Sequence, residues 1–81
     1  MSVVLRYKGD RFLFFSNEGN PREPIHVHDR KVEATAKFWI EPEVTLESSY
    51  KLKSSELTEL EQVVRQNREL IVRAWHEHFG E

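Results

Sequence analysis

The sequence predicts an α+β domain in which an antiparallel sheet of four or five strands carries one long C-terminal helix on one face. Two patterns lead to this prediction. Residues 3–40 contain β-branched and aromatic runs that alternate with period two between turn residues. Residues 54–79 instead place apolar side chains at the spacing of an amphipathic helix. The chain has 81 residues, which suits a single small domain over residues 1–81.

The first two strands form the clearest hairpin. Residues 3–8 and 11–15 are rich in β-branched and aromatic side chains, and Gly9-Asp10 separates them. A two-residue loop with glycine first favours a type II′ turn, because glycine accepts the positive φ that this position requires. This loop predicts that Tyr7 pairs with Phe12.

The next two strands are predicted over residues 25–29 and 32–40, which also alternate. A tight turn at Arg30-Lys31 pairs Val27 with Ala34 and brings the apolar faces of both strands to one side. A slip of one residue would move every side chain to the opposite face, so the shared apolar face favours this register.

Two connecting segments are less regular. Residues 16–24 contain two prolines, a glycine and two asparagines, so we expect a long loop there. Residues 44–52 fit either a short edge strand or an irregular link, and this ambiguity leaves the sheet at four or five strands.

The C-terminal segment predicts a helix over residues 54–79, with Ser54 or Ser55 as the N-cap and Gly80 closing the last turn. One continuous helix of this length would be roughly 39 Å long. Two alternatives follow for so small a domain: a kink near Gln66-Asn67, or an overhang used in dimerisation. The predicted core joins the helix to the strands through Leu5, Phe12, Phe14, Val27, Ala36, Phe38, Leu60, Val64, Ile71 and Trp75.

Composition removes several classes of protein. The absence of cysteine excludes disulfide scaffolds, zinc ribbons, cysteine nucleophiles and iron–sulfur clusters. No apolar run approaches the ~20 residues of a membrane span, and the N-terminus lacks the apolar region of a secretory signal. We therefore expect a cytoplasmic protein with no membrane partner. The net charge of −2 is far from the strongly basic balance of a dedicated nucleic-acid binder.

Two histidines offer the main opportunity for chemistry. His26 and His28 alternate along one strand and point the same way, with Cα atoms roughly 6.6 Å apart. Two imidazoles at this spacing can share a divalent metal ion or act as an acid–base pair. The predicted register places Glu33 opposite His28, as a third metal ligand or an orienting carboxylate. Apart from this metal alternative, no cofactor is expected, and no residue is assigned a catalytic role.

The face of the sheet away from the helix presents a second opportunity. We expect His26, His28, Lys37 and Trp39 to be displayed there. An aromatic ring, two imidazoles and a lysine on an open sheet can stack bases and contact phosphates. The same group can equally form a contact with a protein partner or with a second copy of the chain.

The sequence also resembles a family. It is similar to the small bacterial domain-of-unknown-function 4160 family from about residue 5 to residue 80. The segments that carry this resemblance are Phe12-x-Phe14-Phe15-Ser16-Asn17-Glu18, Pro24-x-His26-Val27-His28, Ala36-Lys37-Phe38-Trp39-Ile40-x-Pro42 and Ala74-Trp75-His76-Glu77-x-Phe79. The chain departs from the family pattern at Ile25, where a second proline is usual, and at Asp29, where an apolar residue is common.

The resemblance implies a bacterial protein encoded beside a second small protein or a regulator, in toxin–antitoxin-like gene pairs. The leading functional prediction is therefore a non-catalytic interaction module that binds a co-encoded partner or itself, as a homodimer. A nucleic-acid binder that uses the open sheet face is one alternative. A histidine-dependent or metal-assisted nuclease or hydrolase is another, and catalysis is the less favoured reading.

Overall fold

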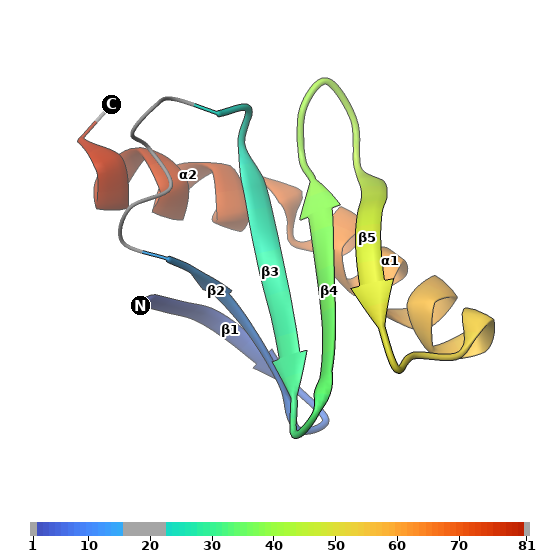
Figure 1. Ribbon diagram of the computed structural model, residues 1–81. Helices are drawn as coiled ribbons and strands as arrows, with labels where there is room; N and C mark the ends of the chain where they lie inside the picture. The colour runs from blue at the N-terminus through green and yellow to red at the C-terminus, as the bar shows by residue number, and fades with distance from the viewer. Residues whose placement is uncertain (1, 16–22, 81) are drawn as a thin grey trace.

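The computed structural model describes residues 2–15 and 23–80, so the predicted loop over residues 16–24 lies mostly outside the described residues. Figure 1 shows one sheet with two helices across one of its faces. The elements are β1 (Ser2–Tyr7), β2 (Asp10–Phe14), β3 (His26–Lys31), β4 (Ala34–Trp39), β5 (Thr45–Tyr50), α1 (Ser54–Gln66) and α2 (Arg68–Phe79). The predicted α+β class is confirmed, with five strands, but the single long helix is wrong.

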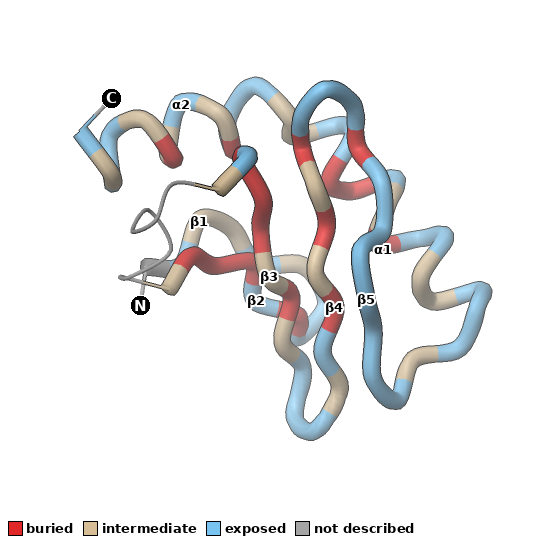
Figure 2. The backbone as a smooth tube through the Cα atoms, turned by 45° about the horizontal axis from the view of Figure 1, so that its top comes forward, coloured by how far each residue is buried: buried red, intermediate tan, exposed pale blue. Residues whose placement is uncertain are grey.

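The sheet is an antiparallel meander in which every strand pairs with its neighbour in the chain, in the order β1-β2-β3-β4-β5. The segment that the sequence left open forms the edge strand β5, and all six of its residues are exposed. Figure 2 shows this contrast, because burial is concentrated on β2, β3, β4 and the helices. The face of the sheet that the helices cover is called the inner face, and the opposite one the outer face.

The loop of the first hairpin lies one residue earlier than predicted, which shifts the strand pairing by two residues. Tyr7 pairs with Asp10 rather than with Phe12, so the loop is Lys8-Gly9. Lys8 has φ 46° and Gly9 has φ 85°. Positive φ at both central positions is the geometry of a type I′ turn, in place of the predicted type II′ turn.

The second hairpin is shifted by four residues from the prediction. Val27 pairs with Phe38 rather than Ala34, and the turn lies at Val32-Glu33 rather than at Arg30-Lys31. Both shifts are even next to the turns, and side chains alternate with period two. A bulge between Val3 and Leu5 changes the β1 register farther from the turn. The inner and outer faces therefore hold the predicted side chains although both registers are wrong.

The helical segment breaks at Asn67, one of the two positions where the sequence suggested a kink. Asn67 has φ −112° and ψ 20°, which is not helical. Its side-chain Nδ2 donates to the carbonyl oxygen of Val63 at 2.8 Å. Asparagine side chains bond nearby backbone groups in this way and so compete with regular helix. The break lets α1 and α2 each follow the inner face of the sheet.

The helix ends agree with the sequence at one terminus only. Gly80 closes α2 in the left-handed conformation at φ 71°, as predicted. At the start of α1, the N-cap is Lys53 instead of Ser54 or Ser55. The Lys53 N–H donates to Glu56 Oε1 at 2.9 Å. A glutamate side chain in the first turn therefore caps this end of the helix, where a serine side chain was expected to do so.

The core lies between the inner face and the two helices. Nine of the ten predicted core residues are buried, and Leu5 is partly buried against them. Trp75 is its largest member and meets Phe14 edge to face, with ring centroids 5.3 Å apart. Such a pair adds to the burial of apolar area and anchors α2 on β2.

Within the described residues, no helix combines the length and apolar character that crossing a membrane requires.

Candidate functional site

The four predicted binding residues lie together on the outer face, at one end of β3 and β4. His26 pairs with Trp39 and His28 pairs with Lys37. The His26 and His28 ring centroids are 5.2 Å apart, and those of His26 and Trp39 are 5.4 Å apart. We call these four residues the outer patch. The sequence predicted that these four residues share a face, but it predicted the wrong cross-strand neighbours for both histidines.

His26 is the buried member of the outer patch. Its side chain is fully buried, although the sequence analysis placed it on an open face. Its Nδ1 lies 2.8 Å from the carbonyl oxygen of Pro24, and a carbonyl only accepts, so this nitrogen carries the proton. The ring also contacts Trp75, with centroids 5.1 Å apart. His26 therefore links the outer patch to the core.

The accessible part of the outer patch is formed by His28, Lys37 and Trp39, which are all half-buried. Lys37 Nζ lies 4.6 Å from the centroid of the Trp39 ring, a cation–π geometry. The same nitrogen lies 3.5 Å from Glu23 Oε1. These contacts hold the lysine and the indole in fixed positions on a rigid pair of strands.

A shallow hollow of about 400 Å³ adjoins the outer patch. Phe15 and His28 line it beside Lys37 and Ser48, and the rings of Phe15 and His28 have centroids 4.5 Å apart. An aromatic ring next to a concave surface is the usual composition of a contact centre in protein interfaces. The outer patch thus offers both a protruding and a receiving surface.

The predicted third metal ligand is not near the histidines. Glu33 lies in the turn between β3 and β4, and its Oε2 is 3.4 Å from Lys51 Nζ. The register shift is the cause, because it places Lys37 rather than Glu33 opposite His28. The register that placed Glu33 opposite His28 is wrong, so the predicted metal set of His26, His28 and Glu33 loses the strand pairing on which it rested. Over residues 2–15 and 23–80, no three His, Asp or Glu side chains gather in a metal-binding arrangement.

Sequence reasoning missed a pair of buried carboxyl groups on the inner face. Asp29 is fully buried and Asp10 is 5% exposed. No donor in the part of the chain that the structure describes reaches the two Asp29 oxygens. Burial, followed by the interaction with Asp10, raises the pKa of Asp29 to about 8, while Lys31 opposes this shift. Asp29 therefore holds a proton at neutral pH.

The alternation of the third strand contained a signal for this pair. Ile25, Val27 and Asp29 are spaced two apart, so they share one face, and two of the three are apolar. Asp29 is also one of the two positions at which the chain departs from the pattern of the family that it resembles. Read in this way, the sequence placed a carboxyl group in the core.

A charged network surrounds the opening above the carboxyl pair. Tyr7 donates a short hydrogen bond to Glu59, and Lys8 Nζ lies 3.1 Å from Glu59 Oε2. The hydrogen bond with Glu59 raises the pKa of Tyr7 and of Lys8, and the bond from Tyr7 lowers the pKa of Glu59. Tyr7, Lys8, Asp10 and Glu59 line a cavity of about 60 Å³. This space is too small for a substrate, so the carboxyl pair is a feature of the core.

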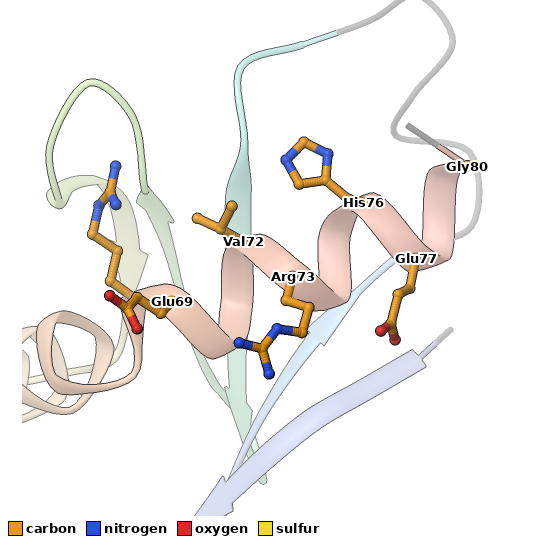
Figure 3. A pocket seen from close by; sticks show the side chains of 7 residues that line it. Glu69, Val72, Arg73, His76, Glu77 and Gly80 are labelled. Atoms are coloured by element: carbon orange, nitrogen blue, oxygen red, sulfur yellow. The ribbon is translucent and has the colours of Figure 1, made fainter.

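A hollow of about 670 Å³ lies along α2. Figure 3 shows that its labelled side chains all come from α2 or from Gly80 just after it, and that they spread around the helix. His76 and Val72 point to one side, whereas Arg73 and Glu77 point to the other. The hollow is a helix surface rather than a cleft between elements, and it brings no chemical groups together.

Comparison with known proteins adds a family. The model of a family described as a domain of unknown function, DUF4160, matches residues 9–76. The chain belongs to the DUF4160 family. No curated protein and no solved structure matches it. The family resemblance is thus confirmed for this DUF4160 protein, and the family description assigns no activity to it.

Proposed function

We propose that this DUF4160 protein is a non-catalytic interaction module that binds a protein partner through the outer patch. The observation that carries the proposal is the state of Trp39. Its indole is half-buried, lies under the Lys37 ammonium and contacts the His26 ring, so it is held in place while part of it still faces outward. Tryptophans held in this way dominate the energy of protein interfaces.

The partner class follows from the same residues. Lys37 and the half-buried His28 surround Trp39 and suit a partner with an apolar anchor and a few carboxylates. The resemblance to gene pairs of the toxin–antitoxin type points to a small co-encoded protein, and a homodimer is the other form of the same proposal. Glu33 does not pair with His28 in the sheet, so among the described residues the hydrolase alternative lacks the third group that was predicted for it.

The test uses a purified pair of proteins. The neighbouring gene product is co-expressed with the DUF4160 protein, and the affinity is measured by calorimetry for the wild type and for Trp39→Ala. The expected loss is at least about thirtyfold, the size of an interface hot spot of 2 kcal/mol. Light scattering on the protein alone measures the homodimer in parallel.

The matched control is Leu70→Ala. Leu70 is 46% exposed and lies on α2, in the layer away from the outer face. This variant should keep full affinity. An unchanged affinity and assembly state in Trp39→Ala, or a loss confined to Leu70→Ala, would refute the proposal.

A further inference from the structure

The strand register places one basic side chain on each of three adjacent strands, directly opposite one another. Arg6 on β1 pairs with Arg11 on β2, and Arg11 pairs with Arg30 on β3. We call these three residues the arginine row. Their chain neighbours Leu5 and Phe12 face the core. Because side chains alternate along a strand, the arginine row lies on the outer face.

The three arginines have no counter-charge among the residues that the structure describes. Over residues 2–15 and 23–80, Arg6, Arg11 and Arg30 make no ion pair, whereas Arg65 pairs with Glu61 at 3.1 Å and Arg68 pairs with Glu41 at 3.6 Å. Adjacent strands lie about 4.8 Å apart, so the arginine row spans about 10 Å. Like charges directly opposite in a sheet are destabilising. The sheet therefore carries a concentrated positive charge that nothing in the described fold neutralises.

The arginine row ends in an aromatic ring, and the acids near it, Glu33 and Glu23, are paired with Lys51 and Lys37. The row continues across the sheet through Thr35 on β4 to Tyr50 on β5, and Tyr50 is 60% exposed. The next row on the same face consists of Leu13, His28, Lys37 and Ser48. The net charge of −2 hides this distribution, since residues 1–40 carry +2 and residues 41–81 carry −4.

We propose that the arginine row binds the phosphate backbone of a single-stranded nucleic acid and that Tyr50 stacks one of its bases. Guanidinium groups pair with phosphates through two parallel hydrogen bonds. Carboxylates accept the same pairing, and the exposed ring on the flat sheet is what favours nucleic acid over an acidic protein surface. Unpaired bases stack on aromatic side chains displayed by open sheets, whereas a duplex keeps its bases inside.

This site differs from the contact proposed for the protein partner. Arg30 and His26 lie four residues apart on β3, which separates the arginine row from Trp39 by roughly 13 Å along the strands. The inference rests on the arginine row and on Tyr50, and none of these residues belongs to the outer patch. One of the two proposals can therefore fail without the other.

The test measures binding of a fluorescein-labelled oligouridylate of about twelve nucleotides by anisotropy, over a range of salt concentrations. Three arginine–phosphate contacts on a single strand predict a slope of about −2 for log K against log salt. Replacing all three arginines by glutamine should abolish the binding, and each single replacement should reduce the slope by about 0.7. Tyr50→Ala should weaken binding roughly tenfold without changing the slope.

The matched control is Arg73→Gln, an exposed arginine on α2 with no ion pair among the described residues. It should leave affinity and slope unchanged, and circular dichroism melts of every variant should show an intact fold. The proposal is overturned if no binding occurs at low salt, or if the triple variant binds as tightly as the wild type. It is also overturned if polyglutamate of similar length binds as tightly as the oligonucleotide, because the site would then fit an acidic protein.

Discussion

The two faces of the sheet differ in how far their side chains are buried and in which groups those side chains contact. On the inner face, Phe14 and Phe38 are fully buried and meet the helices through residues such as Trp75. On the outer face, Trp39 is held in place yet remains partly open, and the arginine row has no counter-charge among the described residues. In the two proposals above, recognition uses the outer face, whereas the core is built on the inner face, so we expect a substitution on one face to affect the other little.

The largest difference in stability should come from replacing each of the two tryptophans, Trp75 and Trp39, by alanine. Trp75→Ala leaves a cavity at the centre of the core and should lower the free energy of unfolding by about 3–5 kcal/mol. Trp39→Ala removes a half-buried ring and should cost about 1 kcal/mol. Urea unfolding followed by circular dichroism measures both. Equal losses in the two variants would contradict the division between the faces.

The next effect concerns the one carboxyl pair on the inner face. The pKa of Asp29 is raised to about 8 in the folded protein, from 3.8 for an ordinary aspartate. The folded state therefore binds the proton more tightly. Its contribution to stability is complete below about pH 4 and is lost as the pH rises towards 8, by at most about 1.4 kcal/mol per pH unit.

Asp29→Asn should remove this dependence. The variant should match the wild type near pH 4 and exceed its stability at pH 8, because the amide carries no charge to bury. Urea midpoints measured across this range provide the check. Glu47→Gln, at an exposed position of β5, is the control and should keep the wild-type dependence. Parallel curves for Asp29→Asn and the wild type would show that Asp29 is not protonated in the core.

A smaller effect on stability is expected at Val32, in the turn that joins β3 and β4. Val32 has φ 48° and is 93% exposed. A β-branched residue is strained in this left-handed region, and asparagine tolerates it. Val32→Asn should therefore raise the free energy of unfolding by about 1 kcal/mol. Val32→Thr keeps the branch and should show no gain, so a similar gain in both variants would point to polarity instead of strain.

The smallest effect should come from the centre of the arginine row. Arg11 lies between Arg6 and Arg30, so Arg11→Gln removes two unfavourable pairings at once. The variant should be more stable by about 0.2–1 kcal/mol at low salt. The gain should disappear at high salt, where these charges are screened. Arg73→Gln on α2 is the control, and a gain in Arg11→Gln that persists at high salt would contradict this explanation.

The sequence determined the faces of the sheet better than its registers. Period-two alternation assigned residues such as Val27 and Ala36 to the core, and both are buried. The turns were misplaced because they contain Lys8 at φ 46° and Val32 at φ 48°. Lysine and valine rarely adopt positive φ, so neither marks a turn in a sequence. A pattern based on glycine found the first turn to within one residue, through Gly9, but had no glycine to mark the second. Even shifts preserve alternation, so the faces survived the errors.

The candidate site shows the same limit. His26 and His28 are two residues apart on one strand, and Lys37 and Trp39 are two apart on the next. The sequence alone therefore predicts that the side chains within each pair point to the same face. The burial of His26 depends on tertiary contacts, including the one with Trp75, and no local pattern encodes it. Glu33 was assigned to the histidines only through the wrong register. The helix breaks at Asn67, whose side chain donates a hydrogen bond to the carbonyl oxygen of Val63. The sequence suggested only a kink near this position.

The strand order has a consequence for synthesis of the chain. All five strands precede both helices, and each pairs only with its neighbour, so residues 2–50 can pair hairpin by hairpin as they leave the ribosome. Until α1 and α2 follow, Phe12, Phe14 and Phe38 have no cover on the inner face. An exposed aromatic sheet is prone to aggregate. The arrival of α1 and α2 therefore decides whether a nascent chain folds or aggregates.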